Sequence, residues 1–552
     1  MTPAVADRWA TIALLLLSAL AFIHLTALPA FEDEGSQLRW IWRALEAGEW
    51  WLPLGEGKPL EAWPMLPLIA IGLPPLLAVR AVHVLAGMIG SALMYRLAAR
   101  TVRRDAAPTS TDTRDTDAWT RERAVGLAAG MIFAVCPFVV YLQRLALSDM
   151  LLCTAGVWVL TAVLKLLSEP SWSRSAAVAA ALVLAALCKL PVGFIFMLAM
   201  PLALVLMPRA SRTRLMRRPA STKLIVATAP VSLLGVLMVV VAAWQWRRGR
   251  AAWFGLEDLL GIGLGHYRTI GSGLGGARPD LLVELATQLS WPVVIVGLIG
   301  LAASALRGDW RQRWLLLMGM VPMLSIGLFT AYWYPRYLLL ALPPLIVCSV
   351  CGWREIGSVP GTAGQAVGGS WPAAGRAGQV AGHAGQVLSV LVLAPCLGLM
   401  GYQSAQLILD PVSARWSPLD RVQYIEGGGS GFGYPEAARF ILSAIRPPAS
   451  ILALDGHSAY QLGVYLPPAW RARVRPVLYA ADGHVLATEQ ARFDSLPPGT
   501  PVWFVIARPL LPRYLISSFG ARAGARLQLR EIATFDKPGS KVQLAIYEAI
   551  RH

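Results

Sequence analysis

Residues 150–167 read MLLCTAGVWVLTAVLKLL and contain a single charged side chain, that of Lys165. An apolar run of this length is about what an α-helix needs to cross the hydrocarbon core of a bilayer. Similar runs recur along the chain, so this stretch predicts one helix of a multi-pass membrane protein.

The composition of the whole chain supports this prediction. Of its 552 residues, 56% are hydrophobic and only 15% are charged, whereas about a quarter of the residues in a soluble protein are charged. Much of the surface must therefore face lipid. Collagen-like, disordered and disulfide-scaffold proteins are excluded by the same figures, and the six cysteines all lie inside apolar stretches, which argues against a disulfide framework or a zinc site.

Apolar runs near 20 residues predict eleven membrane spans. They lie at about 10–29, 81–99, 124–142, 150–167, 175–188, 190–207, 224–244, 290–306, 314–331, 337–352 and 386–404. The stretch Pro64–Val79 is also apolar, but its prolines break helical hydrogen bonding. We therefore expect it to lie at the membrane interface rather than to cross the bilayer.

The arginine-rich loops set the expected orientation. With eleven spans, the basic loops at 100–123, 209–223 and 307–313 fall on one side, which the positive-inside rule makes cytoplasmic. The N-terminus is then cytoplasmic and the chain beyond residue 404 lies outside the cytoplasmic (inner) membrane. This placement accounts for much of the net charge of +17 without a nucleic-acid partner.

These patterns predict three regions in the chain. A transmembrane domain is expected over 1–404, including an external loop at 30–79. A flexible, Gly/Ala-rich cytoplasmic linker is expected at 354–386, because its composition cannot bury a core. The tail at 405–552 alternates helix-like YPEAARFILSAI (434–445) with strand-like SILALDG (450–456), which predicts a small extracytoplasmic α/β domain.

Ionisable side chains gather at the predicted outer ends of the spans. Charges near the hydrocarbon are costly, so those that persist are usually paired or functional. Several cations with a few carboxylates suit a phosphorylated lipid, since cations bind the phosphate and a carboxylate takes the proton of an attacking hydroxyl. The residues concerned are Asp33, Glu34, Lys58, Arg144, Asp149, Lys189, His266, Tyr267, Arg268 and Arg336.

Several motifs among these residues resemble one family. FEDEG (31–35), GEWWLP (48–53) and GKPLEAW (57–63) are similar to the first external loop of polyprenyl-phosphate-sugar glycosyltransferases of the GT-C fold. This group contains the protein O-mannosyltransferases and the lipid A aminoarabinose transferases. RLALSDMLL (144–152), LCKLPVGFIFMLAMP (187–201) and YPRYLLLALPPL (334–345) resemble later elements in the same order. The chain departs from the family pattern at Leu60, Glu61, Ala62 and Leu190.

The resemblance implies a GT-C-type helical membrane protein that inverts the anomeric carbon of the donor sugar. It implies that Asp33 is the catalytic base, with Glu34 beside it and Asp149 as a second acidic residue. The donor phosphate would be bound by Lys58, Arg144, Lys189, Arg336 and Tyr337, with Arg144 also orienting Asp149, and His266, Tyr267 and Arg268 would form a substrate loop. The oxygens of Asp33, Glu34 and Asp149 would suit Mg²⁺ or Mn²⁺ if the enzyme uses a metal.

The expected partners are a polyprenyl-phosphate sugar, membrane lipid, and a lipid, glycan or protein acceptor. A flippase or transporter of a lipid-linked molecule is the alternative, and a lipid-linked polymer ligase or polymerase is a third reading. A carrier should place ionisable residues near the middle of several spans, whereas here they cluster at outer ends. Plainer roles stay open as well: Lys58 and Lys189 as snorkelling side chains, and Asp149 as a charge that stabilises a helix N-terminus.

Overall fold

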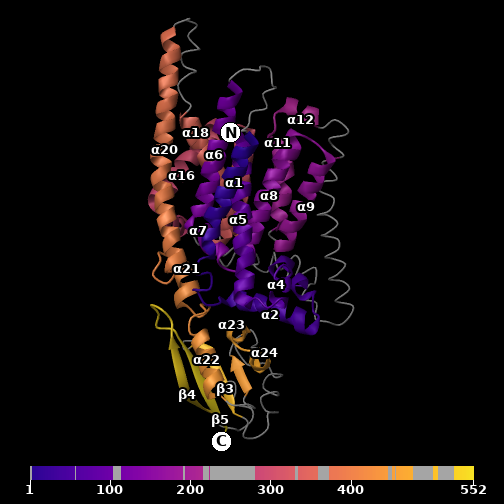
Figure 1. The fold of residues 1–552 in the computed structure, drawn as a ribbon, viewed down its shortest axis with the longest axis vertical. Coiled ribbons are helices and arrows are strands. Elements are labelled where there is room, and N and C mark those ends of the chain that lie inside the picture. Colours follow the sequence, from indigo (N-terminus) through magenta and orange to yellow (C-terminus); the bar gives the residue numbers. More distant parts are fainter. Residues whose placement is uncertain are drawn as a thin grey trace. The chain divides into compact units, whose positions relative to one another are not determined.

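The computed structural model of the chain is mostly helical (Figure 1) and describes residues 3–55, 58–102, 114–189, 193–215, 223, 280–329, 334–357, 372–445, 450–453, 456–476, 501–507 and 527–551. The chain divides into two compact units. Unit 1 contains Met1–Ile23, Trp51–Glu61 and Ala81–Leu409, and unit 2 contains His24–Trp50, Ala62–Arg80 and Asp410–His552.

The described part of unit 1 is helical. Its elements are α1 (Pro3–Ala19), η1 (Leu20–Phe22), α3 (Leu52–Gly55), η2 (Pro59–Glu61), α5 (Pro75–Val102, which begins in unit 2), α6 (Arg114–Val135), α7 (Pro137–Gln143), α8 (Ser148–Ser168), α9 (Trp172–Cys188), η3 (Phe194–Leu198), α11 (Ala199–Leu206), α12 (Arg209–Leu215), α15 (Asp280–Leu289), α16 (Trp291–Arg307), α17 (Trp310–Phe329), η4 (Pro335–Leu340), α18 (Leu342–Gly357) and α20 (Pro372–Leu409).

Several of these helices can cross a membrane, and the protein is a multi-pass membrane protein. Four described stretches are long and apolar enough: Ala4–Phe22, Pro75–Val102, Ser148–Ser168 and Val390–Leu409. Two bent helix pairs raise the number to six if each is one broken span, and one of them bends by 59° next to Pro137, whose missing N–H interrupts helical bonding. The predicted span at 224–244 lies outside the described residues, so the count of eleven stays a prediction.

The linker expected at 354–386 differs from the structure. Residues 354–357 end α18, residues 358–371 lie outside the described part, and residues 372–386 belong to α20, the long orange helix in Figure 1. A stretch that cannot bury a core can still form a helix. Alanine has the highest helix propensity, and this Ala-rich stretch runs directly into the apolar segment that follows it.

Close helix packing in unit 1 depends on glycine. Helices α16 and α18 pack against each other, and a Cβ atom placed on Gly352 would lie only 1.8 Å from the carbonyl oxygen of Gly300. In α8, a Cβ on Gly156 would lie 2.1 Å from the ring of Phe196. Small residues allow membrane helices to approach this closely, and the packing buries nearly all of α8.

Unit 2 is built around a mixed five-stranded sheet with the order β2-β1-β3-β5-β4. The strands are β1 (Ser450–Ala453), β2 (Val474–Pro476), β3 (Val502–Ala507), β4 (Leu527–Asp536) and β5 (Gln543–Arg551). Strands β1, β2 and β3 are parallel, and β5 pairs antiparallel with both β3 and β4. The helices are α2 (Glu32–Ala47), α4 (Leu66–Ala70), α21 (Pro418–Arg421), η5 (Val422–Glu426), α22 (Tyr434–Ala444), α23 (Gly456–Tyr465) and α24 (Pro468–Arg471).

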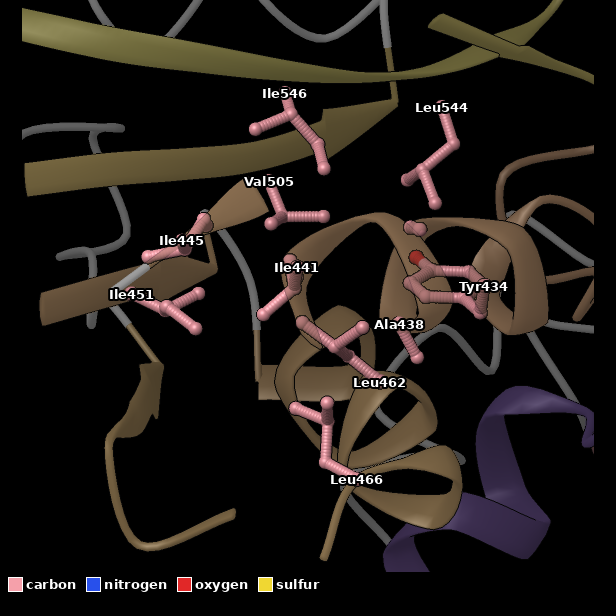
Figure 2. Packing of buried hydrophobic residues seen from close by; sticks show 11 residues of the cluster. Tyr434, Ala438, Ile441, Ile445, Ile451, Leu462, Leu466, Val505, Leu544 and Ile546 are labelled. Carbon is pink, nitrogen blue, oxygen red and sulfur yellow. The ribbon is translucent and has the colours of Figure 1, made fainter. Parts of the chain in front are cut away.

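The core of unit 2 lies between the sheet and two helices. Ile441 of α22 and Leu462 of α23 are buried with Val505 of β3 and Ile546 of β5 (Figure 2). Residues 504–507 of β3 and 544–547 of β5 are all buried, which is typical of strands in the interior of a sheet. The cluster gives the end of the chain its own hydrophobic core.

Two parts of the first external loop, residues 30–50 and 62–79, belong to unit 2. Helix α2 packs on α23 so closely that a Cβ on Gly35 would lie 2.8 Å from the backbone nitrogen of Gln461. The side chain of Gln461 donates to the carbonyl oxygens of Ala30 and Gly429, at 3.0 and 2.8 Å. The boundaries therefore differ from the expected division into 1–404 and 405–552, because residues 24–50 and 62–80 complete the unit formed by the tail.

Candidate active site

Asp149 lies in the first turn of α8 and is buried in unit 1. Its Oδ1 atom is 3.1 Å from Nζ of Lys189, and its Oδ2 atom is 3.9 Å from Nε of Arg336. Lys189 directly follows α9, and Arg336 lies in η4. Three segments far apart in the sequence thus meet at the N-terminus of α8, where the helix dipole also favours a carboxylate.

Two tyrosines surround the cations of this group. The Arg336 guanidinium lies 4.9 Å from the ring centre of Tyr334 and 5.7 Å from that of Tyr337. The Lys189 ammonium lies 5.0 Å from the centre of the Tyr337 ring. The rings meet edge to face, 5.7 Å apart at an angle of 84°. Cation–π contacts hold both cations without neutralising them.

Lys58 and Glu61 bring a further pair of charges to this group. Nζ of Lys58 lies 3.7 Å from Oε2 of Glu61, and Oε1 of Glu61 accepts a hydrogen bond from the backbone N–H of Ser148, at 2.6 Å. The Glu61 side chain is buried, with 1% of its surface exposed. Burial raises its pKa above the ordinary value of 4.5, while the charges of Lys58 and Lys189 act in the opposite direction.

Sequence reasoning missed Glu61 as a site residue. It was visible only as a departure from the family pattern, an acidic residue where aromatic ones are expected after Lys58. A carboxylate in an otherwise apolar stretch is costly to bury, and that cost is the signal that could have singled it out. Together the group holds three cations and two carboxyl groups, Lys58, Lys189, Arg336, Asp149 and Glu61, so an excess of positive charge can bind an anion such as a phosphate.

Asp33 and Glu34 lie in unit 2, in the first turn of α2. Glu34 is fully buried. Its Oε1 accepts a hydrogen bond from Nε of Arg80 at 2.8 Å, and its Oε2 accepts one from Nη2 of Arg80 at 2.6 Å. Oε2 also accepts from the backbone N–H of Phe31, at 2.9 Å, as in a capping box. These bonds give Glu34 a structural role beside Asp33, which is half-buried on the same turn.

Arg80 also forms hydrogen bonds with the segment that precedes α2. Its guanidinium donates to the carbonyl oxygens of Leu25, Leu28 and Pro29, at 3.0, 2.7 and 3.1 Å. A fully buried guanidinium is tolerated only when its donors are satisfied in this way. The ion pair of Glu34 with Arg80 therefore fixes the turn that carries Asp33.

The remaining predicted residues are not brought into this group by the described contacts. Arg144 donates to the carbonyl oxygens of Ala21 and Ile23, at 3.0 and 2.6 Å, and more weakly to that of Ile408. These bonds join the ends of η1 and α20, which is a structural role. The predicted substrate loop of His266, Tyr267 and Arg268 lies outside the described residues.

Two of the three carboxylates named as possible metal ligands form ion pairs within the protein. Glu34 is bound by Arg80, and Asp149 by Lys189. Within the described ranges, no three His, Cys, Asp or Glu side chains gather closely enough to hold a metal ion. A divalent cation held by these carboxylates stays a prediction from the resemblance.

Comparison with known proteins extends these observations. The chain matches no known family model, and no curated protein matches it. It is similar to the crystal structure of ArnT from Cupriavidus metallidurans bound to undecaprenyl phosphate, with a TM-score of 0.58 at 13% identity over 99% of this chain and 97% of that chain. The apo state of that ArnT gives a TM-score of 0.57 at 14% identity, over 99% and 98% of the two chains.

A second protein has a related structure. The archaeal oligosaccharyltransferase AglB from Archaeoglobus fulgidus, in complex with an inhibitory peptide and a dolichol-phosphate, gives a TM-score of 0.50 at 9% identity. The alignment covers 85% of this chain and 64% of that chain. At such identities the likeness establishes the fold alone. The chain therefore has the GT-C fold of these membrane glycosyltransferases.

Proposed function

We propose that this chain is an inverting membrane glycosyltransferase that moves a sugar from a polyprenyl-phosphate donor to a hydroxyl or phosphate group of a lipid, glycan or protein acceptor. The observation that carries the proposal is the cluster of three partly buried cations, Lys58, Lys189 and Arg336, with the buried carboxyl groups of Asp149 and Glu61. Similarity of fold to proteins whose structures hold undecaprenyl phosphate or dolichol-phosphate supports it.

In this proposal the cations bind the donor phosphate and stabilise it as the leaving group. The acceptor oxygen bonds to the anomeric carbon while the bond from that carbon to the phosphate oxygen breaks, and the electron pair leaves with the phosphate. The acceptor proton passes to the carboxylate of Asp33. No general acid is needed, because a phosphate is already a competent leaving group.

The other residues support these roles. Asp149 orients Lys189 and Arg336 through its ion pairs, and both cations also contact the ring of Tyr337. Glu34, paired with Arg80, fixes the turn that presents Asp33. The loop with His266, Tyr267 and Arg268 contacts the substrate.

We place the reaction on the outer face of the cytoplasmic membrane, with eleven spans, a cytoplasmic N-terminus and unit 2 outside. The apolar stretch around α4 supports an interfacial position, since Ile71 is 74% exposed and Trp50 and Trp51 are also exposed. Exposed apolar and tryptophan side chains of this kind are typical of the headgroup region.

The test is transfer from a panel of polyprenyl-phosphate sugars by the purified full-length protein in liposomes. Asp33→Asn should lose at least about a hundredfold in turnover while binding of undecaprenyl phosphate changes little. Lys189→Met should weaken that binding, whereas Lys165→Met, an exposed lysine on α8, should behave as wild type. Movement of the intact donor across the bilayer without any transfer would instead support the flippase.

A further inference from the structure

Helix α8 has no side-chain hydrogen bond from its own N-cap residue. The residue before it is Leu147, whose side chain accepts no hydrogen bond, so the first N–H groups of the helix need another acceptor. Oε1 of Glu61 meets that need for Ser148, at 2.6 Å and from 87 residues away in the sequence. A residue of the first external loop thus fixes the end of the helix that carries Asp149.

The second oxygen of Glu61 faces Lys58. Oε2 lies 3.7 Å from the ammonium and accepts no hydrogen bond from any described residue, although the side chain is buried. A buried carboxyl group with an unsatisfied oxygen costs free energy. A glutamine could accept the same hydrogen bond from Ser148 without burying a carboxyl group, so the cap of α8 alone does not account for a carboxyl group here.

We propose that Glu61 is a positioning residue for the donor-phosphate site, in which Oε1 fixes the first turn of α8 beneath Asp149 while Oε2 sets the position of the Lys58 ammonium. The inference rests on the proposed function, which assigns Lys58 and Asp149 to the donor phosphate. Because Asp149 holds Lys189 and Arg336, Glu61 connects all three cations through one turn of helix.

The electrostatics of the site agree with this geometry. The charged groups that act on Glu61 are Lys58, Lys189 and Asp149. Burial raises the pKa of Glu61, so its carboxyl holds a proton more readily than an exposed one. With or without that proton, Oε1 of Glu61 can accept the hydrogen bond from Ser148.

Two substitutions of Glu61 separate its shape from its hydrogen bond. Glu61→Gln keeps an oxygen that can accept from Ser148 and removes the charge, whereas Glu61→Leu keeps the bulk and removes the acceptor. Because its amide N–H2 replaces the oxygen that faces Lys58, we expect Glu61→Gln to weaken binding of undecaprenyl phosphate while kcat stays within about threefold of wild type, and Glu61→Leu to lose at least about tenfold in kcat. Both would be measured in liposomes, with binding of undecaprenyl phosphate measured in parallel.

A substitution on the other side of the bond provides an independent test. Ser148→Pro removes the N–H that Glu61 binds, at a first helical position that tolerates proline, and the extended backbone of Leu147 suits a following proline. We expect Ser148→Pro to lower kcat as much as Glu61→Leu does, and the double variant to lose no more than either. If Glu61→Leu fails to fold, the kcat of Ser148→Pro measured against wild type still tests the role of the bond.

The outcomes distinguish this inference from the proposed function. Lys58→Met should weaken phosphate binding about tenfold in the wild-type background and clearly less in Glu61→Leu, because Lys58 is then no longer held in place. Wild-type kcat and binding in folded Glu61→Leu and Ser148→Pro, with only a lowered unfolding temperature, would overturn the positioning role. If Lys58→Met and Asp149→Asn also change neither kcat nor binding of undecaprenyl phosphate, the proposed function itself fails.

Discussion

The guanidinium of Arg80 forms two hydrogen bonds with the carboxylate of Glu34, and neither side chain has any exposed surface. The pair joins the start of α5 to the first turn of α2. Breaking a buried pair by removing one partner leaves the other charge without compensation.

Arg80→Met should therefore lower the free energy of unfolding by about 3–5 kcal/mol, since Glu34 is left as an unpaired buried charge. The double variant Arg80→Met with Glu34→Leu should recover much of this loss. Thermal unfolding in detergent checks both. A double variant no more stable than Arg80→Met would show that the pair is not the source of the effect.

Lys537 fixes the glycine-rich loop at residues 427–431. Its ammonium is buried, with 2% of the residue exposed, and it donates to the carbonyl oxygens of Gly427, Gly428 and Ser430 at 2.9, 3.3 and 2.7 Å. In the same loop, the carbonyl oxygen of Gly429 accepts from the N–H of Glu32, at 3.2 Å. The lysine thus supports the start of α2 indirectly.

Lys537→Met should cost about 1–3 kcal/mol of stability, because it leaves buried carbonyl groups unsatisfied. It should also increase hydrogen exchange at the first turn of α2 and reduce turnover. Lys541→Met, which removes an exposed lysine from the same region, is the matched control. Equal exchange in the two variants would contradict the role of Lys537.

The contact between α16 and α18 leaves no space for a methyl group. Gly352→Ala would place its Cβ 1.8 Å from the Gly300 carbonyl oxygen, so the helices must separate, at a cost of about 1–3 kcal/mol or more. Gly297→Ala, on α16 with no atom within 4 Å of the new Cβ, should be neutral or stabilise by up to about 1 kcal/mol. Unfolding temperatures of the two variants test the difference.

Glu61 gives stability a defined dependence on pH. Burial raises the pKa of Glu61 in the folded state above the ordinary 4.5. Between 4.5 and this higher pKa, the folded state binds more protons than the unfolded state. The free energy of unfolding should then fall as pH rises through that window. The difference in unfolding temperature between wild type and Glu61→Gln, measured from pH 4 to 8, isolates the effect. A difference that stays constant with pH would contradict it.

The sequence predicted the parts of the site that adjoin apolar helices. Asp149, Lys189 and Arg336 each stand at the end of an apolar run, and helix ends on one side of a membrane can meet. The bond between Glu61 and Ser148 and the pair of Glu34 with Arg80 could not be predicted in this way. Both depend on which loop residues become buried, and neither hydrophobic periodicity nor spacing carries that information.

Domain boundaries were harder to predict for a related reason. Composition separates polar from apolar stretches, but it does not report which polar stretches pack together. Residues 24–50 join the tail because α2 has an amphipathic face that fits α23. Residues 372–386 were predicted as a flexible linker because their composition cannot form a core. They nevertheless form the start of α20.

The packing of α2 on α23 has a consequence for biosynthesis. Gln461 bonds to Ala30 across 431 residues, and a ribosome completes the first segment long before it makes its partner. The helix that bears Asp33 can adopt its final packing only after every membrane helix between them has been inserted. A nascent or prematurely ended chain that lacks α23 would therefore lack this packing of α2.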